Sequence, residues 1–340
     1  MEQPVVACLW PDPDEFDVDI AHFITTRHPV EVVYAPYREN SATRRARVVS
    51  GVLPERPDIP SNVIAALRRA DAIIARDVPI GTGSFSKARW LHCVYAGVEH
   101  LRGAGLDQTV VTNSAGAGSR SIAEFVITRL LAHWKHLHEI NESQRNGVWE
   151  PHYGGVVAGK KIVVVGLGAI GSSIAVLASG LGMSVIGVRR RGPTGGIPPG
   201  VSKVVGPDGL LSVLSRCDAV VLAAPSTMDT FRLISDRELR AMPRGSVLCN
   251  VSRGALVDEQ ALCGALHDGH LGAAILDVFD QEPLPSSSPL WTIPNAYLSS
   301  HCSISLADYV AGVLNIVDEN LAHFLHGTTL RNVFDTSVAL

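Results

Sequence analysis

Short runs of consecutive apolar residues recur along the chain, and they alternate with stretches whose apolar residues follow a helical period. Uninterrupted apolar runs predict strands that are covered on both faces, as in parallel sheets. Strands that alternate with helices indicate an α/β fold, because parallel neighbours need a crossover connection. The predicted strands are Val5–Trp10, Val30–Tyr34, Ala72–Ala75, Trp90–Val94, Ile162–Val165, Val185–Val188, Ala219–Ala223, Ser246–Asn250 and Ala273–Leu276.

The longest predicted helix lies between the two groups of strands. Apolar residues recur at helical spacing over residues 122–140. Ser121 and Glu124 have the spacing of a capping box at the start of this helix, and Asn146-Gly147 is typical of its end. A further helical pattern covers residues 310–324. The sequence therefore predicts one long connecting helix and a C-terminal helix.

Composition places the chain among two-domain globular proteins. It has 340 residues, of which 46% are hydrophobic and 18% are charged. The net charge of −4 lacks the basic excess of a general nucleic-acid binder, so we expect no nucleic-acid partner. Arg44, Arg45 and Arg47 form a small basic cluster, which we interpret as a solvated face.

The lengths of the apolar runs and the spacing of the cysteines indicate the cellular compartment of the protein. No apolar run approaches the roughly 18–20 residues that cross a bilayer, and acidic residues follow the first run where a signal peptide would be cleaved. No C-x-x-C pair occurs, so we expect reduced thiols in a cytoplasmic protein without a membrane partner. The six cysteines are Cys8, Cys93, Cys217, Cys249, Cys263 and Cys302.

A glycine-rich segment directly follows one predicted strand. The run at 161–165 leads into Gly166-Leu167-Gly168-Ala169-Ile170-Gly171, and a helical pattern follows. Gly166 allows a tight turn, Gly168 lets the backbone approach a pyrophosphate, and Gly171 lets helix and strand pack closely. The N–H groups at the start of the helix, including those of Ala169 and Ile170, favour an anion. This context predicts a dinucleotide site.

The end of the next strand bears on which dinucleotide binds. An acidic residue there would hold the ribose 2′-hydroxyl of NAD, but the chain has Val188-Arg189-Arg190-Arg191. Guanidinium groups bind a 2′-phosphate through paired hydrogen bonds. We therefore expect NADP(H), held by Arg189 and Arg190. An exposed basic loop on an NAD(H) enzyme remains the alternative.

Three later segments contain candidate chemistry, namely Asn250–Asp258, Leu276–Leu284 and Ser299–His301. They resemble, in order and form, the motifs of the D-isomer-specific 2-hydroxyacid dehydrogenases, and their residue types suit the reduction of a 2-oxoacid that this resemblance implies. His301 can give a proton to the carbonyl oxygen, since imidazole ordinarily titrates near neutral pH. Glu282 can orient the imidazole and favour its charged form. Arg253 can bind the substrate carboxylate and polarise the carbonyl.

The same resemblance implies that backbone N–H groups of Tyr95, Ala96 and Gly97 meet the substrate carboxylate. It also implies a homodimer, with the helix over 121–140 and the neighbouring Trp149 as a dimer element. The positions that it implies for the cofactor are Ala224, Pro225, Thr230, Val251 and Asp277, the last accepting from the carboxamide.

Other features leave the substrate open. Arg76, at the end of a strand, meets an anionic substrate tail or is simply a surface arginine. Tyr95 is bulkier than the small polar residue common there, and Cys302-Ser303 replaces the commoner Ile-Gly after the histidine. His133, His136 and His138 lack metal-site spacing, so we expect no metal.

The expected architecture is two doubly wound, Rossmann-like α/β domains with an active-site cleft between them. Residues 1–116 plus 302–340 form the substrate domain, and residues 117–301 form the dinucleotide domain. The expected activity is NADP(H)-dependent reduction of a small anionic 2-oxoacid, similar to glyoxylate or hydroxypyruvate, to the D-2-hydroxyacid. One alternative is the same scaffold acting on formate or phosphite. Another is a non-catalytic, dinucleotide-sensing corepressor.

Overall fold

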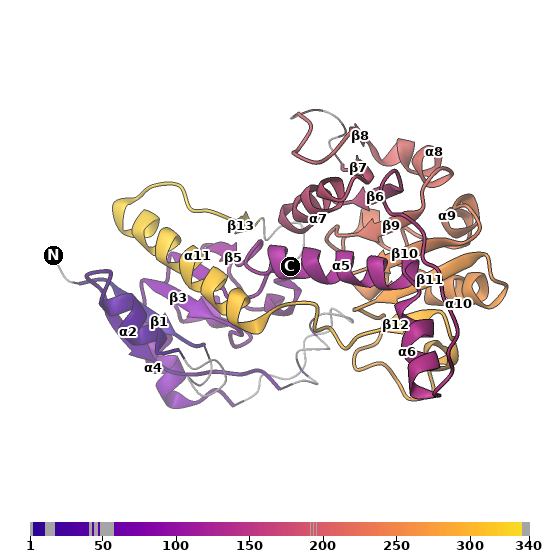
Figure 1. The fold of residues 1–340 in the computed structure, drawn as a ribbon. Helices are drawn as coiled ribbons and strands as arrows, with labels where there is room; N and C mark the ends of the chain where they lie inside the picture. The colour runs from indigo at the N-terminus through magenta and orange to yellow at the C-terminus, as the bar shows by residue number, and fades with distance from the viewer. Residues whose placement is uncertain are drawn as a thin grey trace. The chain divides into compact units, whose positions relative to one another are not determined.

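The computed structural model describes residues 3–10, 18–40, 43, 47, 58–190, 192, 194 and 196–334. The chain divides into two compact units, one formed by Met1–Ala117 with Leu306–Leu340 and the other by Gly118–Ser305. Each unit contains one largely parallel sheet with helices packed on it (Figure 1). This arrangement confirms the predicted α/β class.

The first unit is built on a six-stranded sheet in the order β13-β5-β4-β3-β1-β2. Only β13 runs antiparallel to its neighbour among the described strands. Its elements are β1 (Val5–Cys8), α2 (Ile20–Thr25), β2 (Glu31–Tyr34), α4 (Ser61–Arg69), β3 (Ala72–Ala75), β4 (Trp90–Cys93), β5 (Val110–Asn113), α11 (Leu306–His326) and β13 (Val333–Phe334).

Helices cover both faces of this sheet. β3 and β4 are buried along their whole length, which explains their continuous apolar runs. Helix α4 turns Val63, Ala66 and Leu67 toward one face. Helix α11 comes from the far end of the sequence and packs Val313 and Val317 against the other face, beside β1 and β3.

The second unit is built on a seven-stranded sheet in the order β12-β11-β10-β9-β6-β7-β8, with every described pair parallel. Its elements are α5 (Ser119–Trp134), α6 (Leu137–Arg145), β6 (Lys161–Val165), α7 (Ala169–Gly180), β7 (Ser184–Val188), β8 (Lys203–Val205), α8 (Leu210–Leu214), β9 (Ala219–Leu222), α9 (Asp236–Ala241), β10 (Ser246–Asn250), α10 (Glu259–His267), β11 (Leu271–Leu276) and β12 (Ala296–Leu298).

The strand order of the second unit reverses between β6 and β9. From β6 the chain builds outward through β7 and β8, and then returns to add β9, β10, β11 and β12 on the opposite side. In open α/β sheets, ligands bind beyond the carboxyl ends of the strands at such a reversal. The loops after β6, β9, β10 and β11 therefore define where a site belongs.

The prediction of one long helix over 121–140 is wrong in two respects. The helix begins at Ser119, and the Ser121 hydroxyl donates to the Gly118 carbonyl, so Ser121 is not its cap. The helix is also interrupted, because His136 adopts a left-handed conformation with φ of 54°. This residue separates α5 from α6, which buries none of its residues. No glycine or proline marks the break, so the apolar spacing could not reveal it.

The predicted solvated basic cluster is also wrong where it can be compared. Arg47 is 1% exposed and pairs with Glu39 at 3.2 Å. Its guanidinium also donates to the carbonyls of Arg102 and Val78. Arg44 and Arg45 lie outside the described residues.

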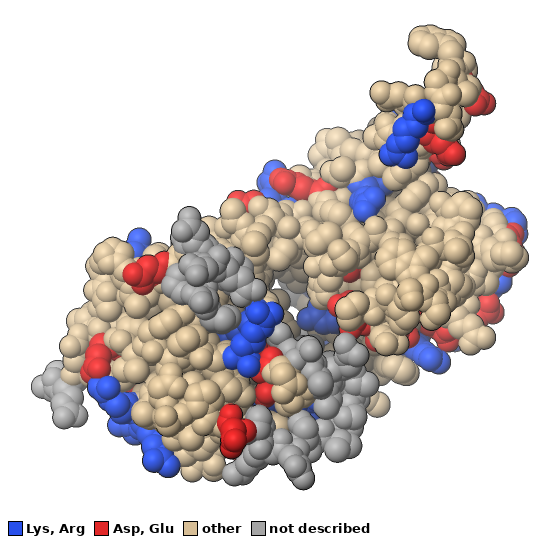
Figure 2. Space-filling view, turned by 90° about the horizontal axis from the view of Figure 1, so that it is seen from below, with Lys and Arg blue, Asp and Glu red and all other residues tan. Residues whose placement is uncertain are grey.

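Charged side chains of both signs occur on the surface. Blue (Lys, Arg) and red (Asp, Glu) side chains are interspersed over the coloured part of the face in Figure 2. Across the described part of the chain, no helix is both long and apolar enough to span a membrane. Of the six free thiols, four are buried, Cys263 is half-buried and Cys302 is exposed.

Candidate active site

The loop between β6 and α7 has the backbone form that its glycines predict. Gly166 has a φ of 95°, and a Cβ on it would lie 2.6 Å from the Ala224 nitrogen. A Cβ on Gly171 would lie 1.9 Å from the Gly166 carbonyl oxygen. Both positions therefore require glycine for packing alone, whether or not a ligand is present.

Gly168 is different, because a Cβ there would meet no protein atom within 4 Å. It is also the N-cap of α7, and no side chain caps that helix. The first N–H groups of a helix need acceptors, and their positive potential favours an anion. The open space beside these donors fits the pyrophosphate of a dinucleotide, with Ala169 and Ile170 in the first turn of α7.

The arginines after β7 do not share one environment. Arg189 donates from Nε to the Gly192 carbonyl at 2.6 Å, and from Nη2 to the carbonyls of Thr194 and Gly196 at 2.9 and 2.7 Å. Its guanidinium therefore holds the loop that follows it. Arg190 is exposed to solvent. Arg191 lies outside the described residues.

Arg253 lies in the loop that follows β10. Asn250, the last residue of that strand, donates from Nδ2 to the Arg253 carbonyl at 2.8 Å. The Asn250 Oδ1 accepts from the backbone N–H and the hydroxyl of Ser252. Arg253 itself is partly exposed and donates from Nη1 to the Ser252 carbonyl at 2.7 Å. The loop thus presents a guanidinium from a fixed backbone.

Glu282 and His301 come together although 19 residues separate them. Glu282 Oε2 lies 2.8 Å from His301 Nδ1, and Glu282 Oε1 accepts from the Phe279 N–H at 3.0 Å. Burial alone would raise the pKa of Glu282. The hydrogen bonds from His301 and Phe279, with the charge of Arg253, bring that pKa below its usual value. The carboxylate is thus held in its charged form beside the imidazole.

Asp277 directly follows β11 and is 1% exposed. Its Oδ1 accepts from the Ser299 hydroxyl at 2.7 Å and from the Cys302 N–H at 2.9 Å. Its Oδ2 accepts from the Ser303 N–H at 3.2 Å, and its carbonyl accepts from the His301 N–H at 2.9 Å. The Asp277 side chain therefore faces the loop that carries His301.

The other residues expected near the cofactor lie at the ends of β9 and β10. Ala224 and Val251 are 8% and 6% exposed. The Thr230 hydroxyl donates to the Pro225 carbonyl at 2.8 Å and accepts from the Thr227 N–H at 2.8 Å. These bonds close the loop after β9 into a compact turn on the side of the sheet where α7 begins.

In the first unit, the residues expected to bind substrate form a cluster of their own. The Arg76 guanidinium lies 5.1 Å from the centre of the Tyr95 ring, in cation–π geometry. The carbonyl of Ala96 accepts from Asn113 Nδ2 at 2.7 Å. That of Gly97 lies 3.9 Å from Cys93 Sγ. The Arg76 side chain is only 13% exposed, so it is not an ordinary surface arginine.

Comparison with known proteins now defines the family. Residues 127–303 match the family model described as D-isomer specific 2-hydroxyacid dehydrogenase, NAD binding domain. The chain belongs to this family of oxidoreductases. The matched domain is the part of the family that binds a nicotinamide dinucleotide, in agreement with the open glycine loop and the uncapped start of α7.

The family relatives differ in their named activities. A glyoxylate reductase of Korarchaeum cryptofilum is 32% identical over 237 residues, which cover 67% of this chain and 70% of that protein. A D-3-phosphoglycerate dehydrogenase of Methanocaldococcus jannaschii is 31% identical over 66% of this chain, but only 43% of its own length is covered. A D-isomer-specific 2-hydroxyacid dehydrogenase of Xanthobacter autotrophicus Py2, solved with NADPH and MES, superposes with a TM-score of 0.80 at 27% identity, covering all of both chains.

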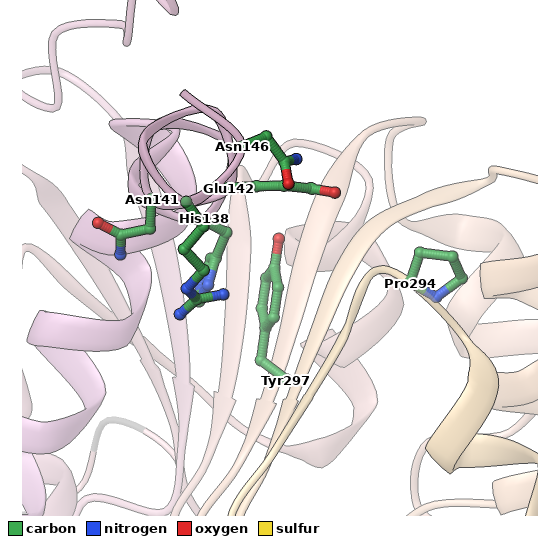
Figure 3. A pocket seen from close by; sticks show the side chains of 7 residues that line it. His138, Asn141, Glu142, Asn146, Pro294 and Tyr297 are labelled. Carbon is green, nitrogen blue, oxygen red and sulfur yellow. The ribbon is translucent and has the colours of Figure 1, made fainter. Parts of the chain in front are cut away.

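A hollow of about 480 Å³ lies between α6 and β12. Figure 3 shows Tyr297 standing in it, with the hydroxyl directed toward Glu142 and Asn146. The His138 ring stacks on Tyr297 with 4.1 Å between ring centres, and His133 lies 6.0 Å from the same ring. Among the described residues, no group of three histidines, cysteines or carboxylates is arranged to hold a metal.

Sequence reasoning did not single out Asn250 or Ser299. Asn250 ends the buried strand β10 and Ser299 directly follows the edge strand β12, and each side chain bonds to a residue at or beyond the end of a strand. A usable signal exists, because a polar residue that ends an apolar strand of a parallel sheet lies at the edge where ligands bind. Applied to β10 and β11, that rule would have identified Asn250 and Asp277 together.

Proposed function

We propose that this protein uses NADPH to reduce a small 2-oxoacid, of the glyoxylate or hydroxypyruvate type, to the D-2-hydroxyacid. The observation that supports this most directly is the Glu282–His301 pair at 2.8 Å, close enough to Arg253 for its charge to lower the Glu282 pKa. A proton donor, a carboxylate that orients it and a guanidinium are the groups that carbonyl reduction of a carboxylate substrate needs.

Each residue has a distinct part in the proposed reaction. The reduced nicotinamide supplies the hydride when it is bound. Arg253 binds the substrate carboxylate and draws electron density from the carbonyl oxygen. His301 gives its proton to that oxygen as the alcohol forms. Glu282 holds His301 by Nδ1, which leaves Nε2 as the proton-donating atom.

The preference for NADPH rests on the absence of an acid after β7. Val188 is followed directly by Arg189 and Arg190; Arg190 is exposed to solvent, whereas the Arg189 guanidinium donates to carbonyls of its own loop. A carboxylate at this position would bind the 2′-hydroxyl of NADH and repel a 2′-phosphate. We expect Arg190→Ser to raise the KM for NADPH by about tenfold and to leave that for NADH unchanged.

We also propose that the protein is a homodimer paired through α6 and the segment after it. The support is a set of large apolar side chains that remain exposed in the single chain, although burying them would be favourable. Trp149 is the extreme case, with 101% of its reference area exposed. The others are Leu137, Ile140, Val148, Tyr153 and Val156.

The deciding experiment measures oxidation of NADPH and of NADH by the purified protein with a panel of 2-oxoacids. Rapid use of NADPH with one small 2-oxoacid supports the proposal and names its substrate. Tight NADPH binding without turnover of any panel member overturns it, and would instead favour a dinucleotide sensor. A preference for NADH would overturn the cofactor part alone.

A further inference from the structure

Two buried polar side chains lie directly beneath the loops that carry the proposed catalytic residues. Asn250 ends β10 and Asp277 follows β11, and both are 1% exposed. The two are neighbours across the sheet, since the Asp277 N–H donates to the Asn250 carbonyl at 3.0 Å. Burying an amide and a carboxylate is costly unless their polar atoms are satisfied.

Both side chains are satisfied by the backbone of these loops together with one serine hydroxyl each. The Asp277 carboxylate accepts from the N–H groups of Cys302 and Ser303, which directly follow His301. It also accepts from the hydroxyl of Ser299, two residues before His301. Asn250 holds the 252–253 loop in the same way, by donating to the Arg253 carbonyl and accepting from Ser252.

The backbone of His301 shows why such bonds matter. His301 has a φ of 52°, a left-handed conformation that a residue with a side chain adopts only when its surroundings impose it. The N–H of His301 donates to the carbonyl of Asp277, and the two following N–H groups donate to its carboxylate. Three consecutive backbone N–H groups at this turn, those of residues 301 to 303, therefore lead to Asp277.

We propose that Asp277 and Asn250 are positioning residues: Asp277 fixes the loop that presents His301, and Asn250 fixes the loop that presents Arg253. The proposal rests on the proposed function for the roles of His301 and Arg253. The positioning role explains what holds His301 and Arg253 in place. It also gives the Asp277 carboxylate a task in the free protein, separate from any bond to the cofactor carboxamide.

The test uses two isosteric exchanges, Asp277→Asn and Asn250→Asp. Asp277→Asn turns one acceptor oxygen into an NH₂ group that faces an N–H donor, so we expect amide hydrogen exchange in 299–303 to accelerate by about tenfold. Asn250→Asp removes the donor to the Arg253 carbonyl, and should accelerate exchange in 251–254 instead. Each variant is the control for the other loop.

A matched control tests whether any carboxylate that accepts from the backbone of this sheet would have the same effect. Asp218 lies just before β9, at the opposite end of the strands, and accepts from the Lys161 N–H at 2.8 Å. Asp218→Asn makes the same chemical change in the same sheet. It should leave exchange in 251–254 and 299–303 at the wild-type rate, and leave turnover unchanged.

Steady-state kinetics distinguish the effect of Asp277→Asn on the His301 loop from that of Asn250→Asp on the Arg253 loop. Asp277→Asn should lower kcat by about tenfold with little change in the KM for the 2-oxoacid, because His301 acts in the chemical step. Asn250→Asp should mainly raise that KM, because Arg253 binds the substrate carboxylate in the ground state as well. A loss of the same kind in both variants, without faster exchange, would overturn the proposal.

A cofactor analogue distinguishes positioning from carboxamide binding. With the 3-acetylpyridine analogue of NADPH, which lacks the carboxamide NH₂, Asp277→Asn should lose the same fraction of kcat as with NADPH. A loss confined to NADPH, with unchanged exchange in 299–303, would show that Asp277 acts on the carboxamide. If Asp277→Asn does not fold, Ser299→Ala removes one of the same bonds, and unchanged exchange at 302 in that variant refutes the proposal.

The exchange measurement needs no turnover. If the wild-type protein reduces no 2-oxoacid, the proposed function fails, while faster exchange of 299–303 in Asp277→Asn still supports the positioning role. If turnover is normal and exchange is unchanged in both variants, the proposed function stands and the positioning role fails.

Discussion

Replacing Glu282 by glutamine tests the centre of the proposed site. The change keeps the shape of the side chain and removes its charge, so Nδ1 of His301 loses a charged acceptor at 2.8 Å. A hydrogen bond to a charged group contributes about 1.5–3 kcal/mol and a neutral one about 0.5–1.5 kcal/mol. The pair is partly solvated, with 37% of the Glu282 side chain exposed, which reduces the difference to about 1 kcal/mol.

That difference corresponds to a loss of about fivefold in kcat/KM for reduction. Fivefold is the lower bound, because the amide can also donate to Nδ1 and favour the wrong tautomer of His301. The assay is kcat/KM for NADPH oxidation over roughly pH 5–9, where imidazole titrates.

A second glutamate supplies the control. Glu238 accepts from the backbone N–H and the hydroxyl of Ser235 at the start of α9. Glu238→Gln should weaken that cap and leave the pH profile unchanged. If Glu282→Gln keeps kcat/KM within about twofold of wild type across that pH range, Glu282 does not orient the proton donor.

The remaining predictions concern the glycine loop, the exposed tryptophan and a buried histidine. Gly168→Ala should leave thermal unfolding of the free protein unchanged but weaken NADPH binding by about tenfold, whereas Gly171→Ala should lower Tm by about 5 °C or more, because its Cβ would overlap the Gly166 carbonyl. Calorimetry of both variants with and without NADPH separates the two effects. Trp149→Ala should weaken self-association by about 2 kcal/mol, measured by sedimentation equilibrium, with no loss of monomer stability since the side chain is exposed. Burial lowers the pKa of His92 to about 3, so between its ordinary value near 6.5 and about 3 the unfolded chain binds more protons and stability falls as the pH falls. Urea unfolding of His92→Gln should therefore show a shallower loss of stability across that range than the wild type does.

All but one of the strands that the apolar pattern predicted lie in the interior of a sheet; the exception is Val30–Tyr34, which corresponds to the edge strand β2. Interior strands are covered on both faces, so their sequences are continuously apolar, as in Ala72–Ala75 and Ala219–Leu222. The pattern missed β8, β12 and β13, which are edge strands of two or three residues whose side chains are partly exposed. It also missed β5, where Thr112 and Asn113 interrupt the apolar run. Short edge strands depend on the neighbour they pair with, which local sequence does not specify.

The site residues were likewise predicted in part: motifs identified the catalytic candidates, but not the contacts that depend on folding. Motif order was enough to single out Arg253, Glu282 and His301, which the structure places in the second unit. It could not show that the Arg189 guanidinium is engaged by carbonyls of its own loop, because those bonds depend on a loop conformation that no periodicity encodes. Nor could it show that the Asp277 carboxylate faces the His301 loop, since its three partners there lie 22 to 26 positions further along the chain and meet it only after folding.

The discontinuous first unit has a consequence for how the protein forms as it is made. Helix α11 completes the core around Val6, Ile74 and Trp90, yet it is synthesised only after the whole second unit. At about 5–20 residues per second, the roughly 190 residues in between take about 10–40 s to make. During that interval the apolar face that α11 will cover is open, and by its end all strands of the second unit have been made. The protein therefore matures from the middle of its sequence outward, and a chain that ends close to residue 306 has a second unit with all of its strands attached to an unfinished and aggregation-prone first one.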